Sequence, residues 1–238
     1  MTEESLSSLT DEVRARLELL ESSRPNHVDA TAVSTTAKLP FKALLYREAL
    51  IWRMVELGRA AFDSFASEKL VSGIVLTRAA VETSAALWYL CAKVAAAVDS
   101  KAVGDIDRYL MKMVMGTATG APAKAASPTD KTLPRPVRVG EFLKAVERDI
   151  PGFSHQYGIL SEYAHPNWAG TALLYSKHDM ETRVTDFGCN VRGAGNTNRI
   201  GVGNLNVALK MFERSYNRIA DLMPDFTAIC ESRLSRKR

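Results

Sequence analysis

The stretch from Pro40 to Val98 constrains the fold more than any other part of the chain. It holds no proline after its first residue, and its apolar side chains recur every three to four positions. This spacing predicts amphipathic α-helices. Proline suits the first turn of a helix, where its missing N–H costs nothing. We therefore expect one long helix from Pro40 to about Ser67 and a second from Glu68 to about Val98, packed as a helical hairpin.

The second of these helices is the most apolar part of the chain. Between Ile74 and Val98 it is interrupted by Arg78, Glu82 and Lys93. A membrane-spanning helix needs a long apolar run with few or no charges. We therefore expect a buried helix rather than a membrane span, and no membrane partner.

Shorter periodic segments complete the prediction of an all-α fold, a helical bundle built on the long hairpin. The additional helices are expected over 105–115, over 141–150, from Ser154 to Ala164 or His165, and from Leu205 onward. Ser154 is the expected N-cap of its helix.

Two strand-like runs precede the last helix, at 172–177 and 182–187. They predict a small β-hairpin at 172–187, which should lie against the helices because an isolated hairpin is only marginally stable. The proline-rich residues 117–138 predict a mobile loop, and the glycine- and asparagine-rich residues 188–203 predict another.

The N-terminal part divides from the bundle at residue 38. Residues 1–38 are expected to form an amphipathic helix and a connector, and residues 39–238 the helical bundle domain. The apolar stripe of the first helix must pack on the core or on a second subunit, since a short helix does not hold itself in water. Its members are Leu6, Leu9, Val13, Leu17 and Leu20.

Composition sets limits on the class of protein. Charged residues make up 24% and hydrophobic residues 46% of the 238 residues, which is ordinary for a folded soluble protein. The net charge of +4 permits contact with nucleic acid without arguing for it. The odd cysteine count and the absence of a Cys-x-x-Cys pair predict a reduced, cytoplasmic protein without a zinc site, and we expect no metal and no cofactor.

Groups that bond or exchange protons gather near the end of one predicted helix. Tyr157, Ser161 and His165 stand four residues apart, so they share a helix face. A helix C-terminus favours the imidazolium form of His165. The strip is a candidate proton-handling site; alternatively, Tyr157 and Ser161 bond to nearby backbone and His165 caps carbonyls or anchors the hairpin.

A second candidate group is Arg78 and Glu82, which have the spacing of an ion pair on one helix face. Their surroundings are strongly apolar, and a buried pair needs further partners because its desolvation is unfavourable. The strip that holds His165 could supply them. The result would be either a structural network or a site with perturbed pKa values.

Weaker candidates for ligand binding are Asn167, Arg192 and Arg199. The two arginines flank a glycine-rich segment that lacks the Gly-Lys-Ser/Thr of a phosphate loop. We interpret the segment as a flexible loop that could still serve as a lid.

The residues of both candidate groups carry a resemblance. The chain resembles a family of bacterial helical proteins of unknown function that combine an Arg-x-x-x-Glu helix with a Tyr-x-x-x-Ser-Glu-x-x-His-Pro segment. The similarity covers about 40–219 and is most specific at the Ser-Glu-Tyr-Ala-His-Pro-Asn run. That family looks distantly related to HEPN (higher eukaryotes and prokaryotes nucleotide-binding) domains. The matching residues here are Arg78, Glu82, Tyr157, Ser161, Glu162, His165 and Pro166.

The resemblance implies a function class. Many HEPN members are metal-independent RNases of toxin and phage-defence systems, and others are inactive binding versions. In the RNase members an arginine precedes the histidine with four to six residues between the two, and the corresponding positions of this chain are Gly158, Ile159 and Leu160. If the chain cleaves RNA, Arg78 from the neighbouring helix would take the place of the missing arginine and hold the phosphate. His165 would then act as general acid or base. Whether the chain is an enzyme stays open.

Two hypotheses follow. In the first, the chain is a HEPN-like protein that binds RNA or a nucleotide in stress or phage defence. In the second, it is a non-catalytic interaction module in which the Arg/Glu/His network is structural. The resembled domains often dimerise, so a homodimer is expected in both.

Overall fold

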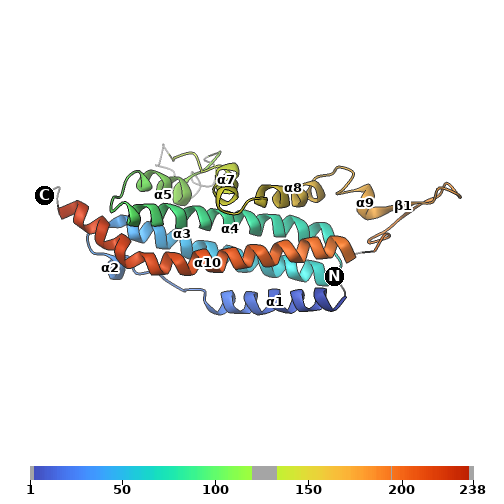
Figure 1. Cartoon of the computed structure of the whole chain (residues 1–238), viewed down its shortest axis with the longest axis horizontal. Coiled ribbons are helices and arrows are strands. Elements are labelled where there is room, and N and C mark those ends of the chain that lie inside the picture. The colour runs from blue at the N-terminus through green and yellow to red at the C-terminus, as the bar shows by residue number, and fades with distance from the viewer. Residues whose placement is uncertain (1–2, 120–132, 194, 236–238) are drawn as a thin grey trace.

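The computed structural model describes residues 3–119, 133–193 and 195–235. Three long helices run side by side along the molecule: α3 (Lys38–Ala66), α4 (Leu70–Asp99) and α10 (Gly195–Ser235) (Figure 1). α4 packs against both of the others. The predicted all-α bundle on a long helical hairpin, with a small β-hairpin before the last helix, is confirmed.

α4 is the central helix of the bundle. Ile74, Leu87 and Leu90 are completely buried in it, and its alanines bring α3 and α10 close. By length and hydropathy alone α4 could cross a membrane, but 61% of its most apolar window is buried inside the fold. Extensive burial of this kind is what the core helix of a bundle requires.

A layer of short helices covers the outer side of α4 (Figure 1). It consists of α5 (Ile106–Met115), α7 (Val139–Asp149) and α8 (Phe153–Ala164). Each buries one stripe, with Leu110, Val146 and Leu160 completely inaccessible. Of the loop predicted at 117–138, residues 120–132 lie outside the described residues.

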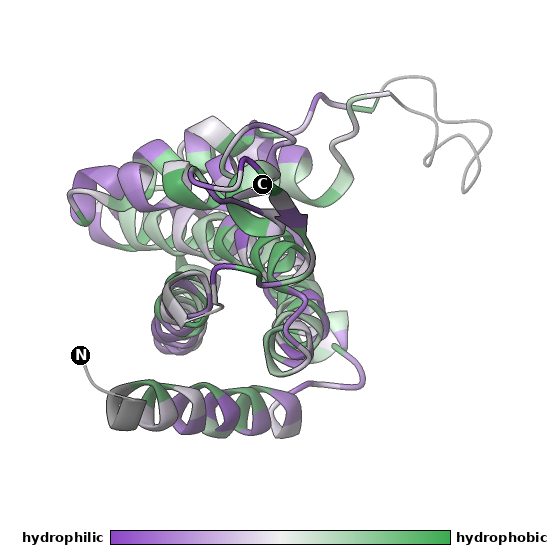
Figure 2. Ribbon diagram, turned by 90° about the vertical axis from the view of Figure 1, so that its right-hand side faces the viewer, coloured by the Kyte–Doolittle hydropathy of each residue, from purple (hydrophilic) through white to green (hydrophobic). Residues whose placement is uncertain are grey.

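The N-terminal helix α1 (Glu3–Ser22) lies across one side of the bundle, against α3 and α10 (Figures 1 and 2). Its stripe is buried within the same chain, since Val13 and Leu17 are fully inaccessible. Glu12 adds an ion pair with Lys210 at 2.7 Å. The short α2 (Ala30–Val33) follows in the connector. The apolar stripe of α1 therefore needs no second subunit to cover it.

The β-hairpin differs from the prediction in its bounds and its place. The first predicted strand begins as a helical turn, α9 (Ala172–Tyr175), whose Leu174 is buried. Only β1 (Ser176–His178) and β2 (Thr185–Phe187) pair, antiparallel, and β2 is exposed throughout. The hairpin projects from the end of the bundle instead of lying against the helices (Figure 1). Leu174, the buried apolar residue of this segment, precedes the strands. The strands themselves bury too little apolar surface to pack on the core.

The second predicted loop, 188–203, is wrong from residue 195 onward, more than half of its length, because α10 begins at Gly195. The reason is close packing around Phe65. A Cβ at Gly201 would lie 2.2 Å from the ring of Phe65, and one at Gly73 would lie 2.4 Å from it. These glycines let α4 and α10 approach the ring, so their role is packing and not flexibility.

Candidate functional site

The start of α8 is fixed by the helix before it. Gly152 precedes α8 in the left-handed conformation, with φ of 89°. The carboxylate of Glu147 accepts hydrogen bonds from the backbone N–H groups of Gly152 at 2.8 Å and Ser154 at 2.6 Å. These bonds hold the pKa of Glu147 below its usual value. The N-terminal N–H groups of α8 are thus capped by Glu147, and the predicted N-cap role of Ser154 is wrong.

α8 is joined to α4 by a three-residue network of Arg78, Glu82 and Tyr157, which we call the α4–α8 clamp. The Tyr157 hydroxyl accepts from Arg78 Nε at 2.9 Å and donates to Glu82 Oε1 at 2.6 Å. Arg78 and Glu82 also form an ion pair at 3.5 Å, four residues apart on α4. The Arg78 guanidinium lies 5.1 Å from the centre of the Tyr157 ring.

The clamp keeps Tyr157 protonated. Burial raises the pKa of Tyr157, the hydrogen bond to Glu82 raises it further, and Arg78 opposes both. Side-chain exposures of 32% for Arg78 and 26% for Glu82 place the clamp at the edge of the core. A neutral phenol between two opposite charges is a hydrogen-bonding link and not a poised base.

Ser161 and His165 are not part of this network. The Ser161 hydroxyl donates to the carbonyl of Tyr157 at 3.0 Å within α8. His165 is the C-cap of α8, and its backbone N–H donates to the Ser161 carbonyl at 3.1 Å. Its side chain is exposed and forms no hydrogen bond or ion pair within the described part of the chain. Eight helical residues separate it from Tyr157, about 12 Å along the axis.

The three weaker candidates lie apart from the clamp. Asn167 shapes the turn after α8: its amide donates to Glu162 at 2.6 Å, and its oxygen accepts from the backbone of Gly170 at 3.1 Å. Arg192 donates from Nε to the Ser176 carbonyl at 2.8 Å and so holds the base of the hairpin. Arg199 lies on the first turns of α10, half-buried at the end of a pocket.

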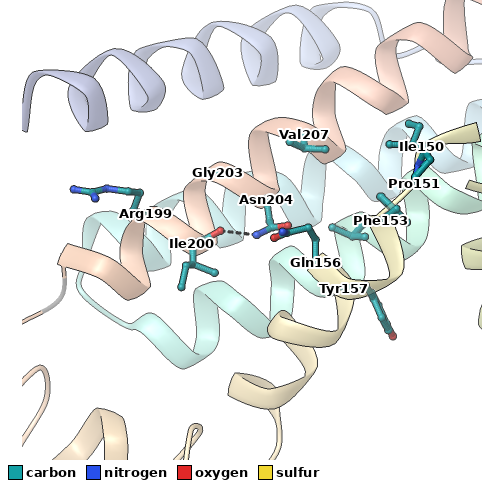
Figure 3. A pocket seen from close by; sticks show the side chains of 12 residues that line it. Ile150, Pro151, Phe153, Gln156, Tyr157, Arg199, Ile200, Gly203, Asn204 and Val207 are labelled. Atoms are coloured by element: carbon teal, nitrogen blue, oxygen red, sulfur yellow. Dashed lines mark hydrogen bonds between the residues drawn. The ribbon is translucent and has the colours of Figure 1, made fainter. Parts of the chain in front are cut away.

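That pocket is a hollow of about 540 Å³ between α8 and α10, with part of α4 as its floor; we call it the α8–α10 pocket (Figure 3). Such a volume is in the range of small-molecule sites, which are mostly apolar with a few placed polar groups. Its apolar walls are formed by Val81, Ile150, Pro151, Phe153, Ile200 and Val207.

Two amide side chains supply its polar character. Gln156 of α8 and Asn204 of α10 lie next to each other in Figure 3. Asn204 donates from Nδ2 to the Ile200 carbonyl at 2.9 Å, and its Oδ1 has no partner among the described residues. The Gln156 amide likewise forms no hydrogen bond there. The pocket therefore offers a donor and acceptors to a guest.

The clamp and the pocket occupy different sides of α8. Tyr157 borders the pocket with its ring, but its hydroxyl points away from Gln156 and Asn204 (Figure 3). The sequence reasoning did not single out either amide. Asn204 falls between the predicted loop, which ends at residue 203, and the helix predicted from Leu205, and Gln156 stands beside the Tyr157 strip without sharing its face.

A second, deeper network was also missed. Arg47 and Glu48 of α3 are each only 9% exposed. Arg47 pairs with Glu48, stacks 3.4 Å from the Tyr216 ring centre and donates from Nε to the Tyr216 carbonyl at 3.0 Å. The Tyr216 hydroxyl donates to Glu48. The sequence held one signal for this network: Arg47 and Glu48 fall between Leu44 and Ile51, within the apolar stripe that α3 buries.

Metal ligation has no candidate within the described ranges, where no three His, Cys, Asp or Glu side chains gather. Cys91, Cys189 and Cys230 are free thiols. No protein-family model, no curated protein and no solved structure matches this chain.

Proposed function

We propose that this chain is a HEPN-like, non-catalytic binding module that takes up the base of an adenine nucleotide or of RNA in the α8–α10 pocket. The observation that carries the proposal is that Gln156 and Asn204 both line a mostly apolar hollow of about 540 Å³. A nucleobase is a flat apolar ring with donors and acceptors along its edge. Such a pocket suits it in both respects.

Adenine is the base that amides recognise best. Asn and Gln side chains can bind it bidentately, donating to one ring nitrogen and accepting from the exocyclic amine. The unpaired Oδ1 of Asn204 and the unpaired amide of Gln156 are available for these bonds. Phe153 and Val81 would cover the faces of the ring. Arg199 lies at the opposite end of the pocket from Pro151 (Figure 3), where the sugar and phosphate would leave.

The proposed lack of catalysis rests on the separation of the candidate groups. A phosphate-cleaving site needs a cation beside its general acid or base. Arg78 is engaged by Tyr157 and Glu82, and the exposed His165 lies about 12 Å further along α8. We expect single-stranded RNA incubated with the protein to stay intact. Cleavage that disappears in His165→Ala would overturn this part of the proposal.

Binding is tested by calorimetric titration with adenosine, which carries no phosphate. Asn204→Leu removes one amide and is expected to weaken adenosine binding about 5- to 100-fold, the worth of one bidentate contact. Asn217→Leu is the matched control, because Asn217 is an exposed residue of α10, about 20 Å along the helix from Asn204. It should bind adenosine as the unchanged protein does.

Two outcomes would contradict the proposal. One is the absence of adenosine binding at millimolar concentration, which would favour the alternative of a protein-interaction module. The other is an equal loss of affinity in Asn204→Leu and Asn217→Leu, which would show that the α8–α10 pocket is not where the base binds.

A further inference from the structure

A second, smaller pocket lies between α4 and α10, near the end of α7. It has a volume of about 180 Å³, which is enough for a phosphate group. Arg214 lies on α10 seven residues after Val207, the last α10 residue of the α8–α10 pocket, so about 10 Å of helix separates the two hollows. The lining residues used below are Trp88, Cys91, Asp149, Arg214, Ser215 and Arg218.

Two arginines make this pocket positive. Arg214 and Arg218 stand four apart, so they share one face of α10. Neither forms an ion pair or a hydrogen bond with any described residue. Arg214 only lies over the ring of Trp88, 5.9 Å from its centre. Two neighbouring guanidinium groups without a counter-charge repel each other, and an oxyanion between them would remove that repulsion.

Ser215, which lines the same pocket, has a buried hydroxyl. Ser215 is only 2% exposed, and its Oγ has no hydrogen-bond partner among the described residues. Buried hydroxyls in folded proteins nearly always have a partner, because leaving one unpaired is unfavourable. An oxygen of a bound ligand would satisfy it. This observation is independent of the arginine pair and indicates the same occupant.

The remaining groups that face the pocket do not oppose an anion strongly. Among the described residues, Asp149 is the only carboxylate that lines it, and it accepts hydrogen bonds from Trp88 Nε1 and Arg148 Nε, each at 3.0 Å. Burial raises the pKa of Cys91, so its thiol stays neutral. Two arginines without ion-pair partners therefore line the pocket, against one carboxylate that is already paired with Arg148.

From this arrangement we infer that the pocket binds the phosphate of a small phosphomonoester, held by Arg214 and Arg218 and by a hydrogen bond from the Ser215 hydroxyl. Guanidinium groups suit phosphate because their N–H donors match its oxygens in pairs. The indole of Trp88 forms the wall against which the organic part would rest. The site is separate from the proposed nucleobase pocket and does not depend on it.

The test is calorimetric titration of the whole chain with inorganic phosphate and with ribose 5-phosphate, at fixed ionic strength. Both should bind at one site. Ser215→Ala removes only the hydroxyl and should weaken phosphate binding about 10-fold without lowering the melting temperature, because it deletes an unpaired group. Arg218→Gln should weaken binding at least as much.

Matched controls separate a built site from general attraction to a basic surface. Arg233→Gln makes the same charge change on α10 about 22 Å away, and Ser232→Ala removes an exposed hydroxyl that bonds the Ile229 carbonyl. Both should leave phosphate affinity unchanged. The inference is overturned if neither probe binds, if Ser215→Ala binds phosphate normally, or if Arg233→Gln loses as much affinity as Arg218→Gln. Asn204→Leu should not alter phosphate binding, so the two proposals fail separately.

Discussion

Replacing Tyr157 by phenylalanine tests whether the α4–α8 clamp holds the fold together. The ring and its contact with Arg78 remain, and only the hydroxyl is lost. That oxygen makes two hydrogen bonds to charged groups, at 2.9 Å and 2.6 Å. A bond of this kind contributes about 1.5–3 kcal/mol when buried. Because Arg78 and Glu82 are about a quarter to a third exposed, we expect a combined loss of about 2 kcal/mol.

The assay is thermal and urea unfolding followed by circular dichroism. For a chain of this length, a loss of about 2 kcal/mol should lower the melting temperature by about 4–8 °C. Tyr163→Phe is the matched control, because Tyr163 is a half-buried tyrosine of α8 whose hydroxyl has no hydrogen bond within the described part of the chain. Equal melting temperatures for the two variants would refute a structural role for the clamp.

Three further predictions concern packing, the buried network and pH. Gly201→Ala should destabilise the fold by about 1–3 kcal/mol in urea unfolding, because its Cβ would lie 2.2 Å from a ring carbon; Gly203→Ala, with nothing within 4 Å, should be neutral or stabilising. Tyr216→Phe leaves a buried carboxylate without its phenol donor and should lower the free energy of unfolding by about 2–4 kcal/mol; a loss below 0.5 kcal/mol would contradict the network. Burial raises the pKa of Tyr46 and Tyr89 to about 12. The free energy of unfolding should therefore be unaffected by these groups below pH 10 and should fall between about pH 10 and 12, where they ionise in the unfolded chain first. A free energy of unfolding that stays constant over this pH range would refute the prediction.

The long helices could be predicted from the sequence because burial on one face leaves a periodic trace. The expected bounds of α3 and α4 agree with Lys38–Ala66 and Leu70–Asp99 to within two residues. The same reasoning placed Arg78 and Glu82 on one face, where they pair. These features depend on spacing within one helix, which the sequence states directly.

The start of α10 could not be predicted in this way. A glycine-rich segment is typical of a loop when no neighbour is known. Here Gly201 is required by the ring of Phe65, which comes from a helix more than a hundred residues earlier in the chain. Only the packed fold shows that the missing side chain makes room for a neighbouring ring.

The prediction of the candidate site was limited for the same reason: the sequence does not show which distant segments come into contact. Four-residue spacing predicted that Tyr157, Ser161 and His165 share a face, but not how much of that face Arg78 could reach. It reaches Tyr157 alone. The α8–α10 pocket is formed by residues about fifty positions apart, Gln156 and Asn204, and neither belongs to a motif. A site between distant segments leaves no local pattern.

The most direct test of the central claim is an NMR titration of the labelled protein with adenosine, following side-chain amide and imidazole signals. If the base enters the α8–α10 pocket, the amide signals of Gln156 and Asn204 should shift together and saturate, while the imidazole of His165 stays unchanged. A shift confined to the imidazole of His165, with both amide signals unchanged, would contradict the account and would indicate that adenosine binds at the end of α8.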